Sequence, residues 1–333
     1  MRAQIEKLNE LLSSKKRISI TTHTNPDGDA IGSSFAIYHF LIKLNHEVKV
    51  ITPNRHPDFL DWVPGIKNLE IYDEYPDKCK KILSDSDLLF TLDFNDLKRA
   101  SNLSYAIDEF NGKIVMIDHH QNPDGYSDIE ISEPDITSTS EMIYKFIELS
   151  DKIHVIDKNI ATCIYLGMMT DTGSFQYRGV NDSTHKIISS LLSFGVDNNK
   201  IYNSVYNSNE ISKLKLLSIA LKNLELIVEK KTAIMFLNQA DLIKNNYRKG
   251  DSEGIVNYGL SLKGIHFSVI FIEDENEKNK FKISFRSKED FPCNEFASKF
   301  FNGGGHLNAA GGLYKGCLLY TSDAADEEDS VDL

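Results

Sequence analysis

Along the first half of the chain, short apolar runs of strand length alternate with stretches in which apolar residues recur at helical spacing. Four short apolar runs have strand length and end in polar residues. They span residues 17–23, 47–52, 87–94 and 113–120. Between them, apolar residues recur at helical spacing, as in 30–44 and 140–149. Strands that alternate with helices are typical of a parallel sheet, so the pattern predicts an α/β domain over 1–190.

The second half of the chain has a different order of elements. The pattern is mostly helical from about 190 to 225, which predicts a helical linker over 191–223. Strand-like runs then return, with two helical stretches beside them. These runs are 224–229, 232–238, 265–274 and 281–287. We therefore expect a second, smaller α/β domain over 224–316.

The composition is that of a soluble globular protein. The chain has 333 residues, of which 41% are hydrophobic and 26% charged, enough for two domains. No apolar stretch approaches the ~20 residues of a membrane span, and the charged N-terminus is unlike a secretory signal. The cysteines are scattered without a C-x-x-C pair, so we expect a cytoplasmic protein with neither a disulfide framework nor a thiolate metal site. They are Cys79, Cys163, Cys293 and Cys317.

The net charge of −12 is unevenly distributed. Residues 1–210 carry −10, whereas 211–316 carry +4, with 16 Lys and Arg against 12 Asp and Glu. A cation site in the front half and an anion site in the back half would produce this asymmetry, although solvated surface charge produces it too. Residues 317–333 carry −6. The run CLLYTSDAADE in this segment resembles a translated sequencing adaptor, so we expect 317–333 to be a non-native or a disordered acidic tail, and a final native strand to be missing.

Candidate metal ligands follow the first strand. His23, Asp27 and Asp29 lie within seven residues of one another. Pro26 disfavours helix before it, and we expect Gly28 to allow the sharp turn by which the two aspartates converge. Close carboxylates repel each other, and a divalent cation removes that cost. Capping of the next helix is the ordinary alternative role for either aspartate.

Three further loops carry the same residue types, and we expect each to follow a strand. They contain Asp93 in TLDFND, the triplet Asp118, His119 and His120 in MIDHHQNPDG, and Asp171 in GMMTDTGSF. Each residue alone fits a turn or a helix cap. Because ligands of parallel sheets bind beyond the carboxyl ends of the strands, four such loops at one sheet edge favour a metal site.

Together these motifs resemble the DHH phosphoesterase family, named for the triplet at 118–120. The match runs in order through HTNPDGDAIGS, Asp93, the triplet and TDTGSF. It continues in FRS at 285–287 and GGGHLNAAGG at 303–312, which resemble the DHH-associated C-terminal domain. The resemblance covers nearly all of 1–316, and it implies a catalytic domain followed by a substrate-binding domain.

The resemblance also implies two divalent metal ions. One would be held by His23, Asp27 and Asp93, and the other by Asp29, Asp93, His119 and Asp171, with Asp93 bridging. Imidazole and carboxylate ligands without sulfur suit Mn²⁺ better than Mg²⁺. Two metals together activate water and neutralise phosphoryl oxygens, so hydrolysis at phosphorus is the expected reaction. Asp118 would orient an imidazole, and His120 would face the substrate as a catalytic residue.

In the second domain the resemblance implies a site for the substrate's phosphate or nucleotide. Gly303, Gly304 and Gly305 would form a loop whose N–H groups approach an anion, and His306 would add a donor. Arg286 would supply a bidentate phosphate contact. The ordinary alternatives are a tight turn for the glycines and a solvated side chain for the arginine. The sequence contains no Walker-type or dinucleotide-binding loop.

Within the family, the length and the GGGH motif most resemble the NrnA type. These enzymes hydrolyse short RNA oligonucleotides (nanoRNA) to mononucleotides and adenosine 3′,5′-bisphosphate to AMP. The alternative is a cyclic-dinucleotide or dinucleotide (pApA) phosphodiesterase, and a non-catalytic RNA-binding protein on the same fold ranks lower. The sequence leaves open the preferred substrate, the cleavage polarity, the physiological metal, the native C-terminus and the oligomeric state, a homodimer included.

Overall fold

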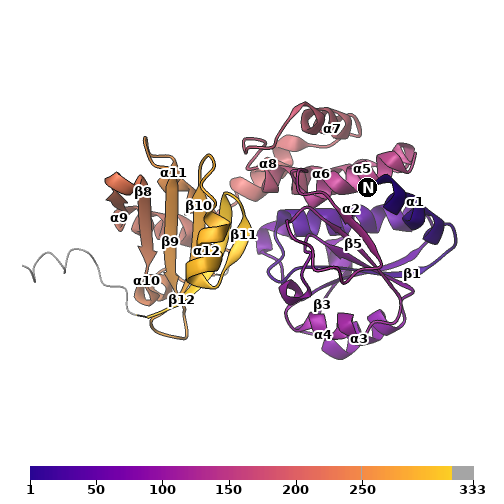
Figure 1. The fold of residues 1–333 in the computed structure, drawn as a ribbon, viewed down its shortest axis with the longest axis horizontal. Coiled ribbons are helices and arrows are strands. Elements are labelled where there is room, and N and C mark those ends of the chain that lie inside the picture. Colours follow the sequence, from indigo (N-terminus) through magenta and orange to yellow (C-terminus); the bar gives the residue numbers. More distant parts are fainter. Residues whose placement is uncertain (249, 317–333) are drawn as a thin grey trace, which may run out of the picture. The chain divides into compact units, whose positions relative to one another are not determined.

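The computed structural model describes residues 1–248 and 250–316, and these form two compact units (Figure 1). The first unit is Met1–Ser208, and the second begins at Asn209. This division lies inside the segment 191–223. The expectations for the tail at 317–333 concern residues outside the described part of the chain. No helix among the described residues is long and apolar enough to cross a membrane.

The first unit is built on a parallel sheet of six strands. Their order is β3-β2-β1-β4-β5-β6, and every neighbouring pair is parallel. The strands are β1 (Arg17–Thr22), β2 (Glu47–Thr52), β3 (Leu69–Ile71), β4 (Leu88–Leu92), β5 (Lys113–Asp118) and β6 (Ile129–Ser132). The predicted α/β fold with a parallel sheet is therefore confirmed, although the periodicity did not reveal the short strands β3 and β6.

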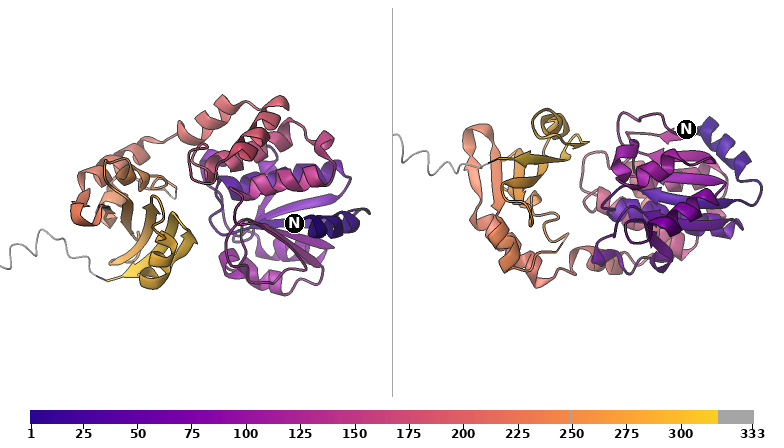
Figure 2. Two further views of the ribbon diagram at one scale, coloured as in Figure 1. Left: turned by 45° about the horizontal axis from the view of Figure 1, so that its top comes forward. Right: turned by 90° about the horizontal axis from the view of Figure 1, so that it is seen from below.

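Helices cover both faces of this sheet. They are α1 (Arg2–Leu11), α2 (Gly28–Lys43), α3 (Pro76–Ser84), α4 (Leu103–Asp108), α5 (Thr139–Leu149), α6 (Lys158–Asp171), α7 (Asp182–Ser193) and α8 (Asn198–Tyr206). Helices α2, α5 and α6 lie on one face, and α3 and α4 lie on the other (Figures 1 and 2). Each face therefore has its own apolar core.

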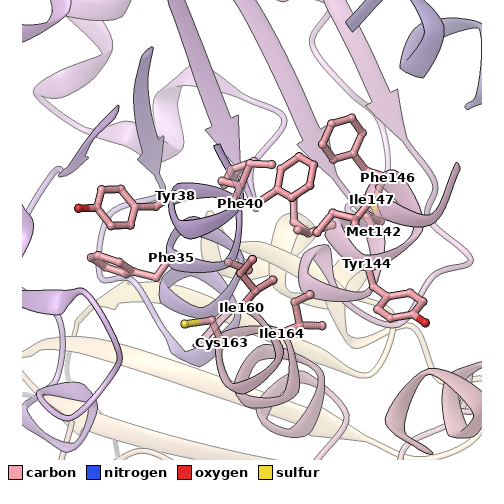
Figure 3. Close-up of a cluster of buried hydrophobic side chains, with 14 of the residues drawn as sticks. Phe35, Tyr38, Phe40, Met142, Tyr144, Phe146, Ile147, Ile160, Cys163 and Ile164 are labelled. Carbon is pink, nitrogen blue, oxygen red and sulfur yellow. The ribbon is translucent and has the colours of Figure 1, made fainter. Parts of the chain in front are cut away.

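Close packing of α2 against α5 and α6 fixes the helix ends that border the site (Figure 3). Phe40 of α2 and Phe146 of α5 meet edge to face, with ring centroids 5.7 Å apart. Gly32 lets α2 approach α6 closely, because a Cβ there would lie 2.6 Å from the carbonyl oxygen of Cys163. The N-terminus of α2 is thereby held beside the C-terminal part of α6, where Thr170 lies against Gly28.

The second unit is a mixed sheet with helices on both faces. The strand order is β11-β12-β10-β9-β8-β7, and β8 with β9 is the parallel pair among these strands. The strands are β7 (Glu225–Ile227), β8 (Thr232–Leu237), β9 (Phe267–Glu273), β10 (Lys280–Ser287), β11 (Gly304–His306) and β12 (Ala309–Lys315). Residues 304–306 are thus a strand, and the prediction of a loop there is wrong.

Alternation along β9 divides the core of the second unit in two. Phe267 and Val269 pack towards α12 (Cys293–Phe301), while Ile270 and Ile272 pack with α9 (Ile211–Lys222) and α10 (Gln239–Lys244). The fourth helix, α11 (Asn257–Leu260), contacts β8 and β9. This is a small α/β unit, as the sequence predicts.

Candidate metal centre

The site lies where the order of the parallel strands reverses. From β1 the chain continues to β2 and β3 on one side, and from β4 it continues to β5 and β6 on the other. His23 follows β1, Asp93 follows β4, and the triplet at 118–120 ends β5. Because β1, β4 and β5 are parallel neighbours, their carboxyl ends bring these side chains to one edge of the sheet.

Asp27 caps helix α2 and also faces the site. Its Oδ1 accepts hydrogen bonds from the amides of Asp29 and Ala30, each at 3.0 Å. Its Oδ2 lies 3.9 Å from Nε2 of His23. The capping role that the sequence offered as an alternative is therefore real, and it leaves one carboxylate oxygen for a ligand.

The turn before α2 is made by Asn25 and not by Gly28. Asn25 has φ 56°, and its amide donates a 2.6 Å hydrogen bond to Oδ1 of Asn54. Gly28 is the first residue of the helix. A side chain there would collide with Thr170, whose Oγ1 would lie 2.4 Å from the added Cβ. The predicted role of Gly28 in the turn is therefore wrong, and the glycine is required by packing.

Asp93 lies between two histidines. Its backbone is left-handed at φ 64°, and its side chain is buried. Oδ2 lies 3.3 Å from Nε2 of His23, and Oδ1 lies 3.6 Å from Nε2 of His119. The hydroxyl of Thr139 donates to Oδ1 at 3.0 Å. One carboxylate thus faces both the His23 and the His119 imidazole.

Both histidines present the same ring nitrogen to the carboxylates. Nδ1 of His23 lies 2.8 Å from the carbonyl oxygen of Thr24, and Nδ1 of His119 lies 3.1 Å from that of Ile136. Because a carbonyl only accepts, Nδ1 is the protonated nitrogen in each ring. The neutral ring then offers its Nε2 lone pair to the site, which is the form that binds a metal.

Asp29 is held by the N-terminus of α5. The amide of Thr139 donates to Oδ2 at 2.7 Å, and the amide of Ser140 donates to Oδ1 at 2.9 Å. Gly167 makes room for this carboxylate, since a Cβ there would lie 2.4 Å from Oδ1. The sequence reasoning missed this support. The run STSE at 138–141 signals it, because Ser138 caps the helix by accepting from the amide of Glu141.

Asp171 reaches the site from a helix and not from a strand end. It is the last residue of α6, and its Oδ2 lies 3.2 Å from Nε2 of His119. The expectation that it follows a strand is wrong, because α6 runs as one helix to this residue. The C-terminus of that helix therefore places a carboxylate beside the side chains at the edge of the sheet.

Two groups of candidate ligand atoms correspond to the two sets implied by the resemblance, although Asp93 is a member of the first group and not of the second. Within each group they lie within 4.8 Å of one another. The groups are His23, Asp27 and Asp93, and Asp29, His119 and Asp171. Each is made of imidazole and carboxylate alone, a donor set that suits Mn²⁺.

Crowding of buried carboxylates shifts their protonation. Burial and the charges of Asp93 and Asp171 raise the pKa of Asp29 well above its usual value. Burial likewise raises the pKa of Asp171 to about 7. For Asp93, the hydrogen bond and charges of the histidines outweigh burial and lower the pKa. For His119, the neighbouring carboxylates outweigh burial and raise the pKa to about 9. Divalent cations would relieve this repulsion.

Asp118 orients His120. It is fully buried, and it accepts from the backbone amide of His120 at 2.9 Å and from Nδ1 of the same ring at 2.7 Å. Asn95, which the sequence reasoning missed, donates from Nδ2 to the carbonyls of His120 and Gln121 at 3.0 and 2.9 Å. The ring is thus fixed from both its side chain and its backbone.

In the second unit, three neighbouring strands bring Arg286 and His306 to one end of the sheet. Arg286 of β10 pairs with Ala309 of β12, which pairs in turn with His306 of β11. Residues directly opposite each other share a face of the sheet. Gly303 and Gly305 are needed for this pairing, because a Cβ on them would lie 1.9 Å and 2.4 Å from backbone oxygens of β12.

Comparisons with known proteins agree with this arrangement. Residues 17–168 match the model of the DHH family N-terminal domain, and residues 215–326 match that of the DHHA1 domain. The bifunctional oligoribonuclease and PAP phosphatase NrnA of Bacillus subtilis is 26% identical over 93% of this chain and 91% of its own. The NrnA protein of Thermus thermophilus is 27% identical over 91% of this chain and 85% of its own.

A solved structure is similar over both units. The crystal structure of an exopolyphosphatase-related protein from Bacteroides fragilis superimposes with a TM-score of 0.91 at 42% identity, covering 99% of this chain and 95% of that one. The two domain matches, this likeness and the clustered motif residues lead to the same assignment. The chain belongs to the DHH family of phosphoester hydrolases and carries a DHHA1 domain after its catalytic domain.

Proposed function

We propose that this chain hydrolyses short RNA oligonucleotides to mononucleotides and adenosine 3′,5′-bisphosphate to AMP, with two Mn²⁺ ions held in the first unit. The NrnA proteins of Bacillus subtilis and Thermus thermophilus support the substrates, since their names give both activities and they match about nine tenths of this chain. The central observation is the position of Asp93 between Nε2 of His23 and Nε2 of His119.

The donor set fits divalent cations. Asp93 turns one oxygen to each group of ligand atoms, and both histidines are fixed with Nε2 towards the carboxylates. His23, Asp27 and Asp93 would hold one ion, and Asp29, Asp93, His119 and Asp171 the other, with Asp93 shared between them. When bound, the ions supply deprotonation of water and neutralisation of phosphoryl charge, which hydrolysis at phosphorus requires.

We assign proton transfer or charge stabilisation to His120. Burial lowers its pKa despite the hydrogen bond from its ring to Asp118. Because Nδ1 is committed to that carboxylate, Nε2 is the nitrogen that would meet a leaving oxygen or a developing charge. Asp118 keeps the ring in this tautomer and orientation. In the second unit, Arg286 and His306 would hold another phosphate or the nucleoside of the substrate.

A second candidate is hydrolysis of cyclic dinucleotides or of pApA. The cyclic-di-AMP phosphodiesterase PdeA of Listeria monocytogenes is 27% identical over 57% of this chain, but the match covers 30% of its own length. The same site chemistry would serve this substrate.

Purified protein with Mn²⁺ should be offered pApA, adenosine 3′,5′-bisphosphate, cyclic di-AMP and pyrophosphate in parallel, with products separated by chromatography. We expect AMP from the first two. Cleavage of cyclic di-AMP well above both would favour the second candidate. Release of phosphate from pyrophosphate alone would contradict the proposal.

A further inference from the structure

Arg99 is a cationic residue outside the sequence motifs, and its main chain lies next to the site. Arg99 belongs to the 3₁₀ helix Leu97–Ala100, which follows Asp93 and its loop. The carbonyl oxygen of Arg99 accepts a 2.7 Å hydrogen bond from the amide of Thr24, the residue after His23. Its main chain is therefore hydrogen-bonded to the loop that carries His23 and Asp27.

The backbone of Arg99 is also fixed from the other side. Asp96 caps the short helix by accepting from the amide of Lys98 at 2.9 Å. Ala100 is fully buried in the core beneath α3 and α4. The position of Arg99 is thus set by a hydrogen bond, a cap and a buried neighbour, so the guanidinium projects from a rigid base.

The positive charge of Arg99 contributes to the pKa shifts of two residues on different strand ends. Burial lowers the pKa of His120, and Arg99 adds to this lowering. At His23, the carboxylates outweigh burial and raise the pKa, and Arg99 opposes them. The hydrogen bond from the amide of Thr24 to the carbonyl of Arg99 agrees with this, because it holds Arg99 next to the loop that carries His23.

Arg99 is half-buried, and its guanidinium makes no hydrogen bond or ion pair with any residue in the ranges 1–248 and 250–316. This differs from Arg17, which forms a 3.0 Å ion pair with Asp87. A partly buried arginine would ordinarily be paired, because burial removes water from some of its five donors. Its donors are therefore available to an anion that the chain does not supply.

The charge of the metal-loaded site indicates why a phosphate would need a further cation. Four carboxylates in the two ligand groups, Asp27, Asp29, Asp93 and Asp171, carry about −4 when ionised, and two divalent cations cancel this. A loaded site of that kind is close to neutral. It would attract a phosphate only weakly unless another cation is present. The planar guanidinium matches two oxygens of one phosphoryl group.

We propose that Arg99 binds the non-bridging oxygens of the scissile phosphate. The inference rests on the proposed function of the same site. Hydrolysis breaks the bond from phosphorus to the leaving oxygen and forms one to the water oxygen, and one proton of the water ends on the leaving oxygen. Arg99 stays protonated throughout and stabilises the charge that grows on the non-bridging oxygens. The substrate class is thus any phosphoester that reaches the site, with no preference for a base or sugar.

This role predicts a pattern across substrates. Arg99→Gln should lower kcat/KM about ten- to a hundredfold for pApA, for adenosine 3′,5′-bisphosphate and for the generic ester bis-p-nitrophenyl phosphate alike, as expected for loss of one charge-assisted contact. Arg99→Lys should retain only part of the parental kcat/KM, because lysine lacks the planar pair of donors of a guanidinium. Inorganic phosphate should inhibit Arg99→Gln at least tenfold more weakly than the parent.

The matched control is Lys98→Gln, since Lys98 is the preceding residue and its side chain is 91% exposed. It should retain parental rates and parental inhibition by phosphate. Manganese binding by calorimetry and the melting temperature should be unchanged in both glutamine variants. Added guanidinium should partly restore the activity of Arg99→Ala.

Three results would overturn the assignment of Arg99. They are parental rates in Arg99→Gln, a loss confined to the nucleotide substrates, and a loss that parallels loss of manganese. If the parent hydrolyses the generic ester but neither pApA nor the bisphosphate, the proposed substrates are wrong. The comparison on the generic ester then still decides the role of Arg99.

Discussion

Asp118 holds His120 by accepting two hydrogen bonds, one from the backbone amide at 2.9 Å and one from Nδ1 at 2.7 Å. The carboxylate is fully buried directly at the end of β5. Two hydrogen bonds accepted by one carboxylate fix both the position and the tautomer of the ring. The first and third residues of the DHH triplet therefore act as a pair, while the second turns to the ligand cluster.

Replacement of Asp118 by Asn should reduce turnover while the metal site stays loaded. The amide retains one acceptor but loses the charge that holds Nδ1–H, which is worth ~1.5–3 kcal/mol, or roughly ten- to a hundredfold in kcat. Steady-state kinetics with pApA and manganese calorimetry measure the two effects. Asp124→Asn, at an exposed position in the following loop, is the control. A parental kcat in Asp118→Asn would show that the pair is only structural.

His119 and His120 should have separable roles. His119 faces Asp93 and Asp171 with Nε2, so His119→Ala should weaken manganese binding. His120→Ala should leave the metal content largely intact and depress turnover. Metal analysis and kinetics of both variants test this. Equal loss of manganese from the two proteins would refute the division.

The residue types at the strand ends could be predicted from sequence, because each loop follows an apolar run and carries ligand-type side chains. His23, Asp93 and His119 converge as expected for neighbouring parallel strands. Asp171 could be assigned to the site only through its motif. Its pattern gave no reason to expect a ligand at the end of a helix, where tertiary packing of α6 against α2 places it.

Other features could not be predicted because they depend on contacts between distant segments. The amides of α5 that hold Asp29 lie 110 and 111 residues away along the chain. The left-handed turn at Asn25 is stabilised by Asn54, whereas the sequence pointed to the neighbouring glycine. The glycines of GGGH predicted a loop, yet Gly303 and Gly305 are needed for close strand pairing. A glycine-rich run does not distinguish a flexible loop from a crowded strand edge.

Protonation of the ligands should make manganese-free protein sensitive to pH. The pKa values of His119 and Asp171 in the fold are raised to about 9 and about 7, above their unfolded values. Each group therefore contributes stability that is present below its unfolded pKa and is lost as pH rises through its folded pKa. Manganese binding requires the deprotonated forms. The rise in melting temperature on adding Mn²⁺ should thus grow between about pH 6 and 9, as thermal scans with and without EDTA can measure. A rise that stays constant or shrinks over this range would contradict it.

Loss of Arg286 should affect nucleotides and spare a generic ester. If Arg286 and His306 hold a second phosphate or the nucleoside, Arg286→Ala removes a contact worth ~1.5–3 kcal/mol, or roughly ten- to a hundredfold in kcat/KM for pApA and the bisphosphate. Bis-p-nitrophenyl phosphate makes no such contact, so its hydrolysis should change little. Lys282→Ala, on the same strand, serves as the control. Equal slowing of all three substrates in Arg286→Ala would remove the second unit from nucleotide binding.

The number of manganese ions that Asp93 holds tests the account most directly. Calorimetry should count two Mn²⁺ per chain for the parent, measured together with the turnover of pApA. Asp93→Asn keeps a residue type that tolerates φ 64°, so folding should survive, but it removes the carboxylate that faces both ligand groups. We predict that this variant fails to hold two ions and loses several orders of magnitude in turnover. Two bound Mn²⁺ and near-parental turnover in Asp93→Asn would contradict the two-metal site.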